Sequence, residues 1–373
     1  MLRYILFGRA PSGRAFRFKS SHDGCMRRAA IVVWAFRFNP SRNRCPFMLL
    51  LFNFNLGLAL QKMIAHFLFF VAFIISTNAI GNKINGSEAI QIGGIKQWIK
   101  FKGDNNQAPV LLFLHGGPGN SVMAYADKFT SELQQHFIVV QWDQRGSGQT
   151  DVLNNYLGPL TVSLFVSDAI ELIRSLASKF SQEKIYLMGH SWGGYLGLRV
   201  AAERPELLKG YFAVSPMINQ LESERLSLNS MIEKANKENN KQAASELDQV
   251  KIPFENGEQL YYHRKWLSKF MASSIPTRAK VATWASKWLT LFNEASQTNF
   301  FEFAPELKCP VYFLIGSNDY QTHFSLAESY YQQVVCKEKK LYWFTDSAHK
   351  PHLTEPLKFQ KIIIDIKKQT PQL

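Results

Sequence analysis

Cysteine is scarce in this sequence: four cysteines occur in 373 residues, too few for a fold that disulfides hold together. With 22 glycines and 15 prolines, the composition excludes a collagen-like or low-complexity chain. No HExxH, HxxEH or paired-cysteine spacing is present, so the sequence predicts no metal site and no cofactor. Hydrophobic residues make up 46% of the chain, and a buried core must therefore hold the fold.

Acidic residues are few near the start of the chain, and this accounts for most of the net charge of +14. Residues 1–62 carry eleven Lys or Arg and one acid, Asp23, a net charge of +10, which leaves +4 for residues 63–373. The body has no basic stripe interleaved with aromatic residues. We therefore expect it to bind no nucleic acid.

Residues 63–79 have the pattern of a signal peptide. An apolar run over 67–75 is followed by Thr77 and Ala79, small residues at positions −3 and −1 of a cleavage point. The alternative is a membrane anchor, for which Lys62 and the upstream arginines would supply the positive flank. We expect an exported protein, periplasmic or secreted, or one that meets the membrane only through this uncleaved segment.

Residues 1–62 form a basic N-terminal extension, and over 1–47 neither helical nor strand periodicity is visible. We hypothesise that the extension is not translated and that the chain starts at Met63, with Met48 as the alternative start. A real basic arm ahead of a membrane anchor is the competing interpretation.

Beyond residue 80, strand-like and helix-like patterns alternate, which favours an α/β fold: a mostly parallel eight-stranded sheet with helices on both faces. The later strands are short continuous apolar runs, as expected for strands buried on both faces. The predicted strands are 89–92, 97–101, 110–114, 137–142, 185–188, 210–214, 311–315 and 341–344, and the predicted helices are 125–135, 162–179, 192–203, 325–334 and 356–368.

Residues 217–300 interrupt this alternation. The segment is polar and helical in pattern, and Pro253 and Gly257 mark a turn before an aromatic-rich part. We interpret 217–300 as a helical lid inserted between the sixth and seventh strands. It divides the core into residues 80–216 and 301–373.

Cys309 and Cys336 stand just ahead of two predicted strands, 311–315 and 341–344. Parallel neighbours begin at the same end of a sheet, so a disulfide between the two is geometrically open in an exported chain. Two reduced thiols are the alternative.

The strongest motif is Gly189-His190-Ser191-Trp192-Gly193, which follows an apolar strand and precedes a helical pattern. G-x-S-x-G in this context is a nucleophile elbow, a sharp turn that holds its serine at the tip. A Cβ at either outer glycine would collide with the neighbouring strand or helix. Ser191 is therefore the candidate nucleophile.

A serine hydroxyl needs an imidazole to take its proton and a carboxylate to orient that imidazole, and in this motif the order is serine, acid, histidine. Asp319 leaves the strand end after the lid, where the neighbouring Asn318 cannot ionise. His349 follows the last strand, with His352 as its rival. Asp346 is a weaker alternative acid.

A second half of an oxyanion site is expected in the loop after the third strand. There the sequence reads His115-Gly116-Gly117-Pro118-Gly119. Backbone N–H groups at a glycine pair can approach a substrate oxygen closely, and the N–H of Trp192 would complete the site.

Together these residues resemble the α/β-hydrolase fold, and specifically the proline iminopeptidase-like serine peptidases of family S33. The resemblance covers residues 88–368 and rests on five motifs. They are HGGPG at 115–119, DQRGSG at 143–148, GHSWGG at 189–194, the strand-end Asp319 and SAHKPH at 347–352.

The resemblance implies roles for individual residues. Ser191 would be the nucleophile, Asp319 the orienting acid and His349 the general base, with Gly117 and Trp192 as the amide donors of the oxyanion hole. It also implies that glutamates of the lid bind the free N-terminal amine of the substrate, and Glu222 and Glu224 are the candidates. A solvated helix face is the competing interpretation of both.

The sequence departs from the family pattern at two points: His190 stands where a small residue is usual, and Gln149-Thr150 where Arg-Ser is common. These departures leave a hydrolase in place and weaken the expectation of proline preference.

Three functions follow from these residues. The leading one is a serine hydrolase that removes an N-terminal residue, often proline, from short peptides through an acyl-enzyme. The alternative is an esterase or amidase for small acyl substrates, and a non-catalytic binding module on the same scaffold belongs to a different class. The expected partner is a small peptide or small acyl substrate, and the sequence gives no oligomeric state.

Overall fold

A computed structural model gives the structure of the protein and describes residues 81–369. Its centre is an eight-stranded sheet with the order β1-β2-β4-β3-β5-β6-β8-β10. All eight predicted strands are present, so the mostly parallel eight-stranded sheet is confirmed. The strands are β1 (Ile84–Ile92), β2 (Ile95–Gly103), β3 (Val110–Leu114), β4 (Ile138–Asp143), β5 (Ile185–His190), β6 (Leu208–Val214), β8 (Val311–Gly316) and β10 (Lys339–Phe344).

The first two strands make the antiparallel part of the sheet. β1 and β2 form a hairpin in which Ile92 pairs with Ile95 across Gly93 and Gly94, and β2 is antiparallel to β4. The remaining neighbours are parallel. Because the carboxyl ends of parallel strands meet at one edge, the loops after β3, β5, β8 and β10 lie at the same edge of the sheet.

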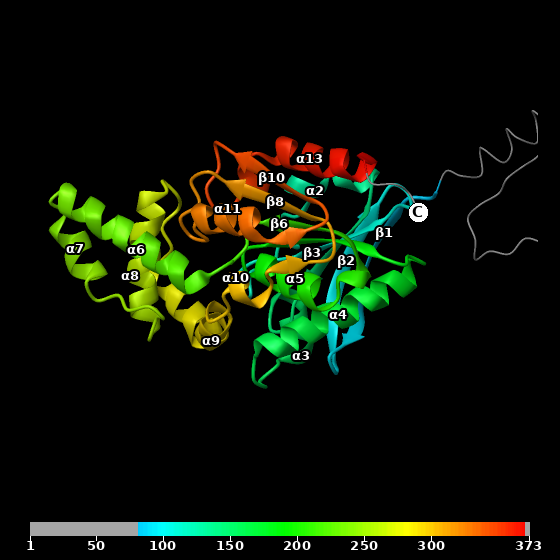
Figure 1. Ribbon diagram of the computed structural model, residues 1–373. Helices are drawn as coiled ribbons and strands as arrows, with labels where there is room; N and C mark the ends of the chain where they lie inside the picture. Colours follow the sequence, from blue (N-terminus) through cyan, green and yellow to red (C-terminus); the bar gives the residue numbers. More distant parts are fainter. Residues whose placement is uncertain (1–80, 370–373) are drawn as a thin grey trace, which may run out of the picture. The chain divides into compact units, whose positions relative to one another are not determined.

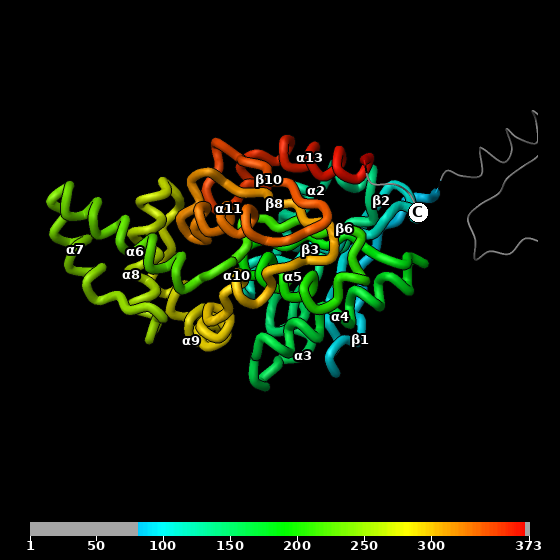
Figure 2. The backbone as a smooth tube through the Cα atoms, in the orientation of Figure 1, coloured from blue at the N-terminus to red at the C-terminus, as the bar shows by residue number. Residues whose placement is uncertain are grey.

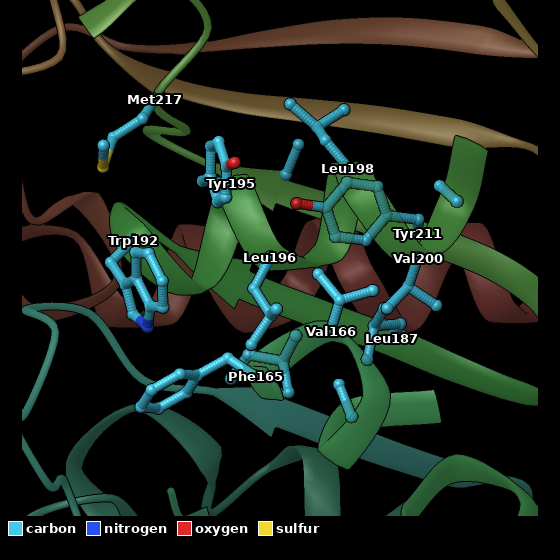
Figure 3. Packing of buried hydrophobic residues seen from close by; sticks show 14 of the residues in the cluster. Phe165, Val166, Leu187, Trp192, Tyr195, Leu196, Leu198, Val200, Tyr211 and Met217 are labelled. Atoms are coloured by element: carbon cyan, nitrogen blue, oxygen red, sulfur yellow. The ribbon is translucent and has the colours of Figure 1, made fainter. Parts of the chain in front are cut away.

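Helices cover both faces of the sheet (Figure 1). Leu112 and Leu114 of β3 pack in the cluster that contains α4 (Val162–Lys179) and α5 (Trp192–Glu203). Figure 3 shows part of this cluster, where α4, α5 and β5 meet. The alternate residues Leu111 and Phe113 pack in the second cluster, with α2 (Asp127–Thr130) and α13 (Pro356–Gln369). Burial on both faces explains why these strands are continuous apolar runs.

The lid is helical, and it enters the chain between β6 and β8. Figure 2 follows the backbone out of β6 into α6 and back through α9 towards the sheet. All five of its helices begin at a side-chain cap, in which Asn219, Asn240, Asn256, Thr277 and Asn299 accept a backbone N–H. The helices are α6 (Gln220–Lys237), α7 (Lys241–Leu247), α8 (Gly257–Phe270), α9 (Arg278–Ser296) and the short α10 (Phe300–Phe303).

Some elements differ from the sequence prediction. The helix predicted at 125–135 is divided into α2 and a 3-10 turn, Leu133–Gln135, because the N–H of Glu132 donates to the side chain of Gln360 on α13. Helix α3 (Gly148–Asn154) was not predicted, since its apolar residues Val152 and Leu153 are exposed and leave no amphipathic pattern. Two short paired strands, β7 (Glu306–Leu307) and β9 (Val335–Cys336), were also missed.

The cysteine pair is reduced in this structure. Cys309 is buried and Cys336 half-buried, and both are free thiols. The Cys336 thiol donates to the main-chain oxygens of Cys309 and Glu338, each at 3.1 Å. Burial raises the pKa of the Cys309 thiol to about 12, so the thiolate form is strongly disfavoured.

The predicted basic extension, 1–62, and the predicted signal peptide or anchor, 63–79, lie outside the described residues. Within residues 81–369 no helix combines the length and the hydropathy needed to cross a membrane.

A buried ion pair joins the hairpin to the rest of the sheet. Arg145, in the turn after β4, bonds Asp168 of α4 through both Nε and Nη2 at 2.9 Å, and neither side chain is more than 1% exposed. Arg145 also donates to the main-chain oxygen of Gly93 at 2.8 Å. The side chain of Gln97 donates to Asp168 at 2.7 Å and accepts from the indole of Trp142 at 2.9 Å. The charges are therefore satisfied by several partners, as buried charges require.

Replacing Asp168 by Asn is expected to lower the free energy of unfolding by about 3–5 kcal/mol, because the Arg145 charge would stay buried without its counter-ion. Urea unfolding at pH 7 measures this loss. As a control, Asp151→Asn breaks the half-exposed Lys287–Asp151 pair and should cost under ~1 kcal/mol. Equal losses in the two variants would contradict this account of the buried pair.

Candidate active site

Ser191 lies in the sharp turn between β5 and α5. Its φ is 57°, a left-handed conformation that is rare outside glycine. A Cβ on Gly189 would come within 2.1 Å of the Gly193 oxygen, and one on Gly193 within 2.0 Å of the Leu114 oxygen. Both flanking glycines are therefore required by backbone contacts, one to the helix and one to β3.

Two other loops bring a carboxylate and an imidazole to this serine. His349, after β10, places Nε2 3.0 Å from the Ser191 Oγ. Its Nδ1 lies 3.0 and 3.2 Å from the two carboxylate oxygens of Asp319, which follows β8. The three residues, separated by up to 158 positions in sequence, form one hydrogen-bonded chain at the carboxyl edge of the sheet.

The hydrogen bonds define the tautomer of His349. A carboxylate only accepts, so Nδ1 of the neutral ring carries the proton and donates it to Asp319. Nε2 is then the acceptor, facing the Ser191 hydroxyl. This is the arrangement in which an imidazole can take a proton from a serine.

Asp319 is fully buried and held by its own loop. The N–H groups of Gln321 and Thr322 donate to Oδ1 at 3.0 and 3.1 Å, and the Thr322 hydroxyl donates to Oδ2 at 2.9 Å. Burial by itself raises the pKa of this carboxyl, but the adjacent His349 and these hydrogen bonds outweigh burial and hold the pKa below its ordinary value. The acid therefore remains ionised at neutral pH.

The first lid helix, α6, is fastened to the loop that carries Asp319. Gln220 donates to the main-chain oxygen of Gln321 at 2.9 Å, and Ser223 donates to the same oxygen at 3.2 Å. The Ser223 hydroxyl also accepts the N–H of His323 at 2.7 Å. The lid thus shares hydrogen bonds with the segment that positions the acid.

The glycine loop after β3 approaches Ser191 from the other side. A Cβ on Gly116 would lie 3.3 Å from the Ser191 Cβ, and Gly116 and Gly117 both line the cavity next to the serine. Trp192 is the first residue of α5, and the first N–H groups of a helix have no partner within the helix. The predicted amide donors, Gly117 and Trp192, thus flank Ser191.

A cavity of about 1250 Å³ opens onto Ser191 and His349, between the lid and the carboxyl edge of the sheet. Its apolar wall includes Met217, Trp284 and Phe292. Its charged lining residues are Arg264, Lys280, Lys350 and Asp346. Cations outnumber carboxylates on this wall.

The two glutamates predicted to bind an amine do not line this cavity. Glu222 is partly exposed on α6, 3.5 Å from Arg225. Glu224 is buried, and its carboxylate accepts from Arg264 at 2.5 and 2.7 Å and from Gln220 at 2.7 Å. Burial alone raises the pKa of Glu224, but the charge of Arg264, the adjacent His263 and the hydrogen bonds from Arg264 and Gln220 together outweigh burial, and the pKa lies below its ordinary value.

A second histidine, His190, packs against His349, and a third, His352, packs against His190. The ring of His190 lies 4.8 Å from that of His349 and 4.5 Å from that of His352, and His190 Nε2 donates to the main-chain oxygen of His349 at 2.7 Å. His352, the rival base, packs against Phe129 at 4.8 Å. Burial lowers the pKa of His352 to about 3, so this ring stays neutral.

Sequence reasoning missed the residues that hold the site in place. Thr322 was not singled out, although it stands three positions after Asp319. In sequence, Gln220, Ser223 and Ser227 of α6 look like part of a polar helix. In the structure each is buried against the loop that carries Asp319, the acid loop. Their spacing of three and four residues puts them on one helix face, and this periodicity was the available signal.

Among residues 81–369 no group of three His, Cys, Asp or Glu side chains is placed to hold a metal ion.

Stability should fall in mild acid because of His352. In an unfolded chain a histidine gains a proton below about pH 6.5, whereas folded His352 does so only near pH 3. Between these values the unfolded state binds one more proton, so the free energy of unfolding decreases as the pH falls. The slope of this free energy against pH is proportional to the difference in bound protons between the unfolded and folded states. In His352→Phe that difference, measured by urea unfolding from pH 6 to 4.5, should be smaller by about one proton. The two slopes should coincide above pH 7.5, and equal slopes below pH 6 would refute this role.

Comparison with known proteins agrees with this geometry. The α/β hydrolase fold family matches residues 109–356. A Bacillus subtilis (strain 168) protein named "Probable aminopeptidase YbaC" is 30% identical over 295 residues, which cover 72% of this chain and 92% of that protein. A proline iminopeptidase of Heyndrickxia coagulans is 23% identical over 287 residues, covering 73% and 95% of the two chains.

Solved structures show the same fold. The proline iminopeptidase of Mycobacterium smegmatis superposes with a TM-score of 0.54 at 17% identity, covering 76% of this chain and 98% of that one. Sheet order, elbow and family match therefore agree: the chain belongs to the α/β-hydrolase fold family, among hydrolases whose relatives are named as aminopeptidases and proline iminopeptidases.

Proposed function

We propose that the protein is a serine hydrolase that removes the N-terminal residue of short peptides through an acyl-enzyme, with Ser191, His349 and Asp319 as its catalytic triad. The observation that carries the proposal is the hydrogen-bonded chain from Ser191 through His349 to Asp319, open to a large cavity. The names of the related aminopeptidase and proline iminopeptidase support the peptide substrate.

In the first step the Ser191 Oγ attacks the substrate carbonyl carbon while its proton passes to His349 Nε2. Asp319 keeps the ring in the required tautomer and stabilises the imidazolium that forms. Because Asp319 is buried and ionised, its charge acts on His349 with little screening by solvent.

The carbonyl oxygen becomes an oxyanion as the C–O bond to Ser191 forms. We assign its stabilisation to the N–H groups of Trp192 and Gly117, which flank the serine. Each such donor is worth about 3 kcal/mol in the transition state.

Collapse of the tetrahedral intermediate breaks the bond to the leaving group, which takes the proton from His349. Water then attacks the acyl ester of Ser191, with His349 as base, and the same oxyanion site serves the second intermediate. Both halves of the reaction use one set of residues.

An aminopeptidase needs a carboxylate for the ammonium of its substrate. Glu222 and Glu224 stay predictions for this role. An ammonium would reach the Glu224 carboxylate only by replacing Arg264. Among the described residues that line the cavity, Asp346 supplies the carboxylate. It is exposed, and we consider it a third candidate.

A specific observation favours a second function, an esterase or amidase for small acyl substrates. The cavity presents Lys280 and Lys350 against Asp346, while the charge of Arg264 is paired with Glu224, and an ammonium brought to this wall would meet a net positive charge. An acyl group without a free amine meets no such cost. The two functions share the triad and differ in whether substrate binding needs the amine.

A fluorophosphonate probe is expected to label Ser191 in the folded protein, because its hydroxyl lies 3.0 Å from Nε2 of His349, which can take its proton. Ser191→Ala should abolish labelling, whereas Ser230→Ala, whose hydroxyl bonds only within α6, should label like the wild type. Labelling is read by intact-protein mass. Failure of the folded wild type to react would favour the non-catalytic binding module.

The substrate class is tested by comparing kcat/KM for prolyl and alanyl anilides with kcat/KM for a short-chain nitrophenyl ester. On the proposal, anilide cleavage is efficient and disappears when the substrate amine is acetylated, since the amine anchors the substrate. Both activities should vanish in Ser191→Ala. Ester cleavage alone, or anilide cleavage indifferent to acetylation, would replace the aminopeptidase by the small-acyl hydrolase.

A further inference from the structure

One buried glutamine connects the two loops that flank Ser191. Gln144 follows β4 and is fully buried. Its Nε2 donates to the main-chain oxygen of His115 at 3.0 Å, and its Oε1 accepts from the indole N–H of Trp192 at 2.9 Å. Both ends of the side-chain amide are thus used, one on the glycine loop and one on the elbow.

The main chain of Gln144 acts on the glycine loop as well. Its N–H donates to Nε2 of His115 at 3.3 Å, and the Ser147 hydroxyl lies 3.1 Å from the same nitrogen. Burial lowers the pKa of His115, so the ring is neutral. Because Nε2 accepts, Nδ1 carries the proton and donates to the main-chain oxygen of Gly116 at 2.9 Å.

These bonds fix the orientation of two successive peptide planes. In a planar trans peptide the C=O of one residue and the N–H of the next point in opposite directions. The bond from Gln144 to the His115 oxygen therefore orients the N–H of Gly116, and the bond from His115 to the Gly116 oxygen orients the N–H of Gly117. Both glycines border the cavity beside Ser191.

On the elbow side, the bond to Gln144 fixes the indole of Trp192. That ring is stacked on Tyr195 with centroids 5.5 Å apart and lies edge-on to Phe165 at 5.4 Å, and Figure 3 shows the three rings together. The indole is thereby held at both its apolar surface and its N–H. The main chain of Trp192, which begins α5, is held with it.

We propose that Gln144 is a positioning residue that aligns the amide donors Gly117 and Trp192 on one oxyanion by hydrogen bonding to both loops. The inference rests on the proposed function, since it requires an acyl-transfer reaction at Ser191. Gln144 itself touches no reacting atom.

The turn that carries Gln144 is held by other contacts, so a change of its side chain tests alignment and spares the fold. Arg145 is fixed by Asp168. The Ser147 N–H and hydroxyl both donate to the Gln144 main-chain oxygen, at 3.0 and 2.6 Å. The main-chain N–H of Gln144 persists in any variant but proline.

The experiment compares Gln144→Met with Gln141→Met in the whole protein. Methionine keeps the length and apolar stem of glutamine and loses both hydrogen bonds. Gln141 lies in β4 and is buried, and neither atom of its side-chain amide has a hydrogen-bond partner among the described residues, so it is the matched control. The readouts are kcat and KM for a nitrophenyl ester, Ki for a trifluoromethyl ketone that forms an oxyanion on Ser191, and Ki for the carboxylic acid product.

We expect kcat of Gln144→Met to fall roughly 10- to 100-fold, less than the loss expected on removing a donor outright. The trifluoromethyl ketone Ki should rise by a similar factor, while KM and the Ki of the acid product change less than about threefold, because only the oxyanion uses the aligned amides. Gln141→Met should match the wild type. If Gln144→Met does not fold, Trp192→Phe removes the indole N–H and leaves the main-chain amide, and the same split between the two inhibitors is expected.

Activity of Gln144→Met within twofold of Gln141→Met would overturn the proposal. So would equal weakening of the ketone and the acid product, which would indicate general loosening of the cavity. Failure of the proposed function itself is recognised separately, as absence of esterase and peptidase activity in the wild type before any variant is made.

Discussion

The left-handed backbone of Ser191 is the constraint on which the rest of the site depends. A non-glycine residue at φ 57° costs about 1–3 kcal/mol, and such strain persists only where the surroundings enforce it. Here the Ser191 N–H donates to the Val214 oxygen at 3.0 Å and its carbonyl accepts the Tyr195 N–H at 2.9 Å. β6 and α5 therefore hold the serine from both sides.

The two buried carboxylates near the cavity are kept ionised in different ways. Asp319 and Glu224 are both buried carboxylates with lowered pKa values, but the first is set by hydrogen bonds from its own loop and by His349, while the second is neutralised by Arg264. The first carboxylate stays available to orient an imidazole. Glu224 and Arg264 both belong to the lid, so the arginine that the lid contributes to the cavity has its charge already compensated.

Much of this arrangement could be predicted from the sequence because strands buried on both faces leave continuous apolar runs, and because the elbow needs glycine at 189 and 193. Chain order and a place after a strand single out Asp319 and His349 as candidates. Gln144 and Ser223 could not be found in the same way. A buried polar side chain is recognised only by what it bonds, and their partners, His115, Trp192 and Gln321, come from other parts of the chain. Helix α3 was missed because its apolar residues face solvent, against the rule on which helix prediction relies.

The attachment of α6 to the acid loop limits how substrate can reach Ser191. Gln220 and Ser223 bond the main chain at 321 and 323, so swinging α6 outward would disturb Asp319 at the same time. The irregular, largely exposed segment 271–277 between α8 and α9 also lines the cavity, through Ser273 and Ser274. The insertion therefore borders the cavity with a helix hydrogen-bonded to the loop of Asp319 and with an irregular exposed stretch, and these bonds couple the helix to the acid.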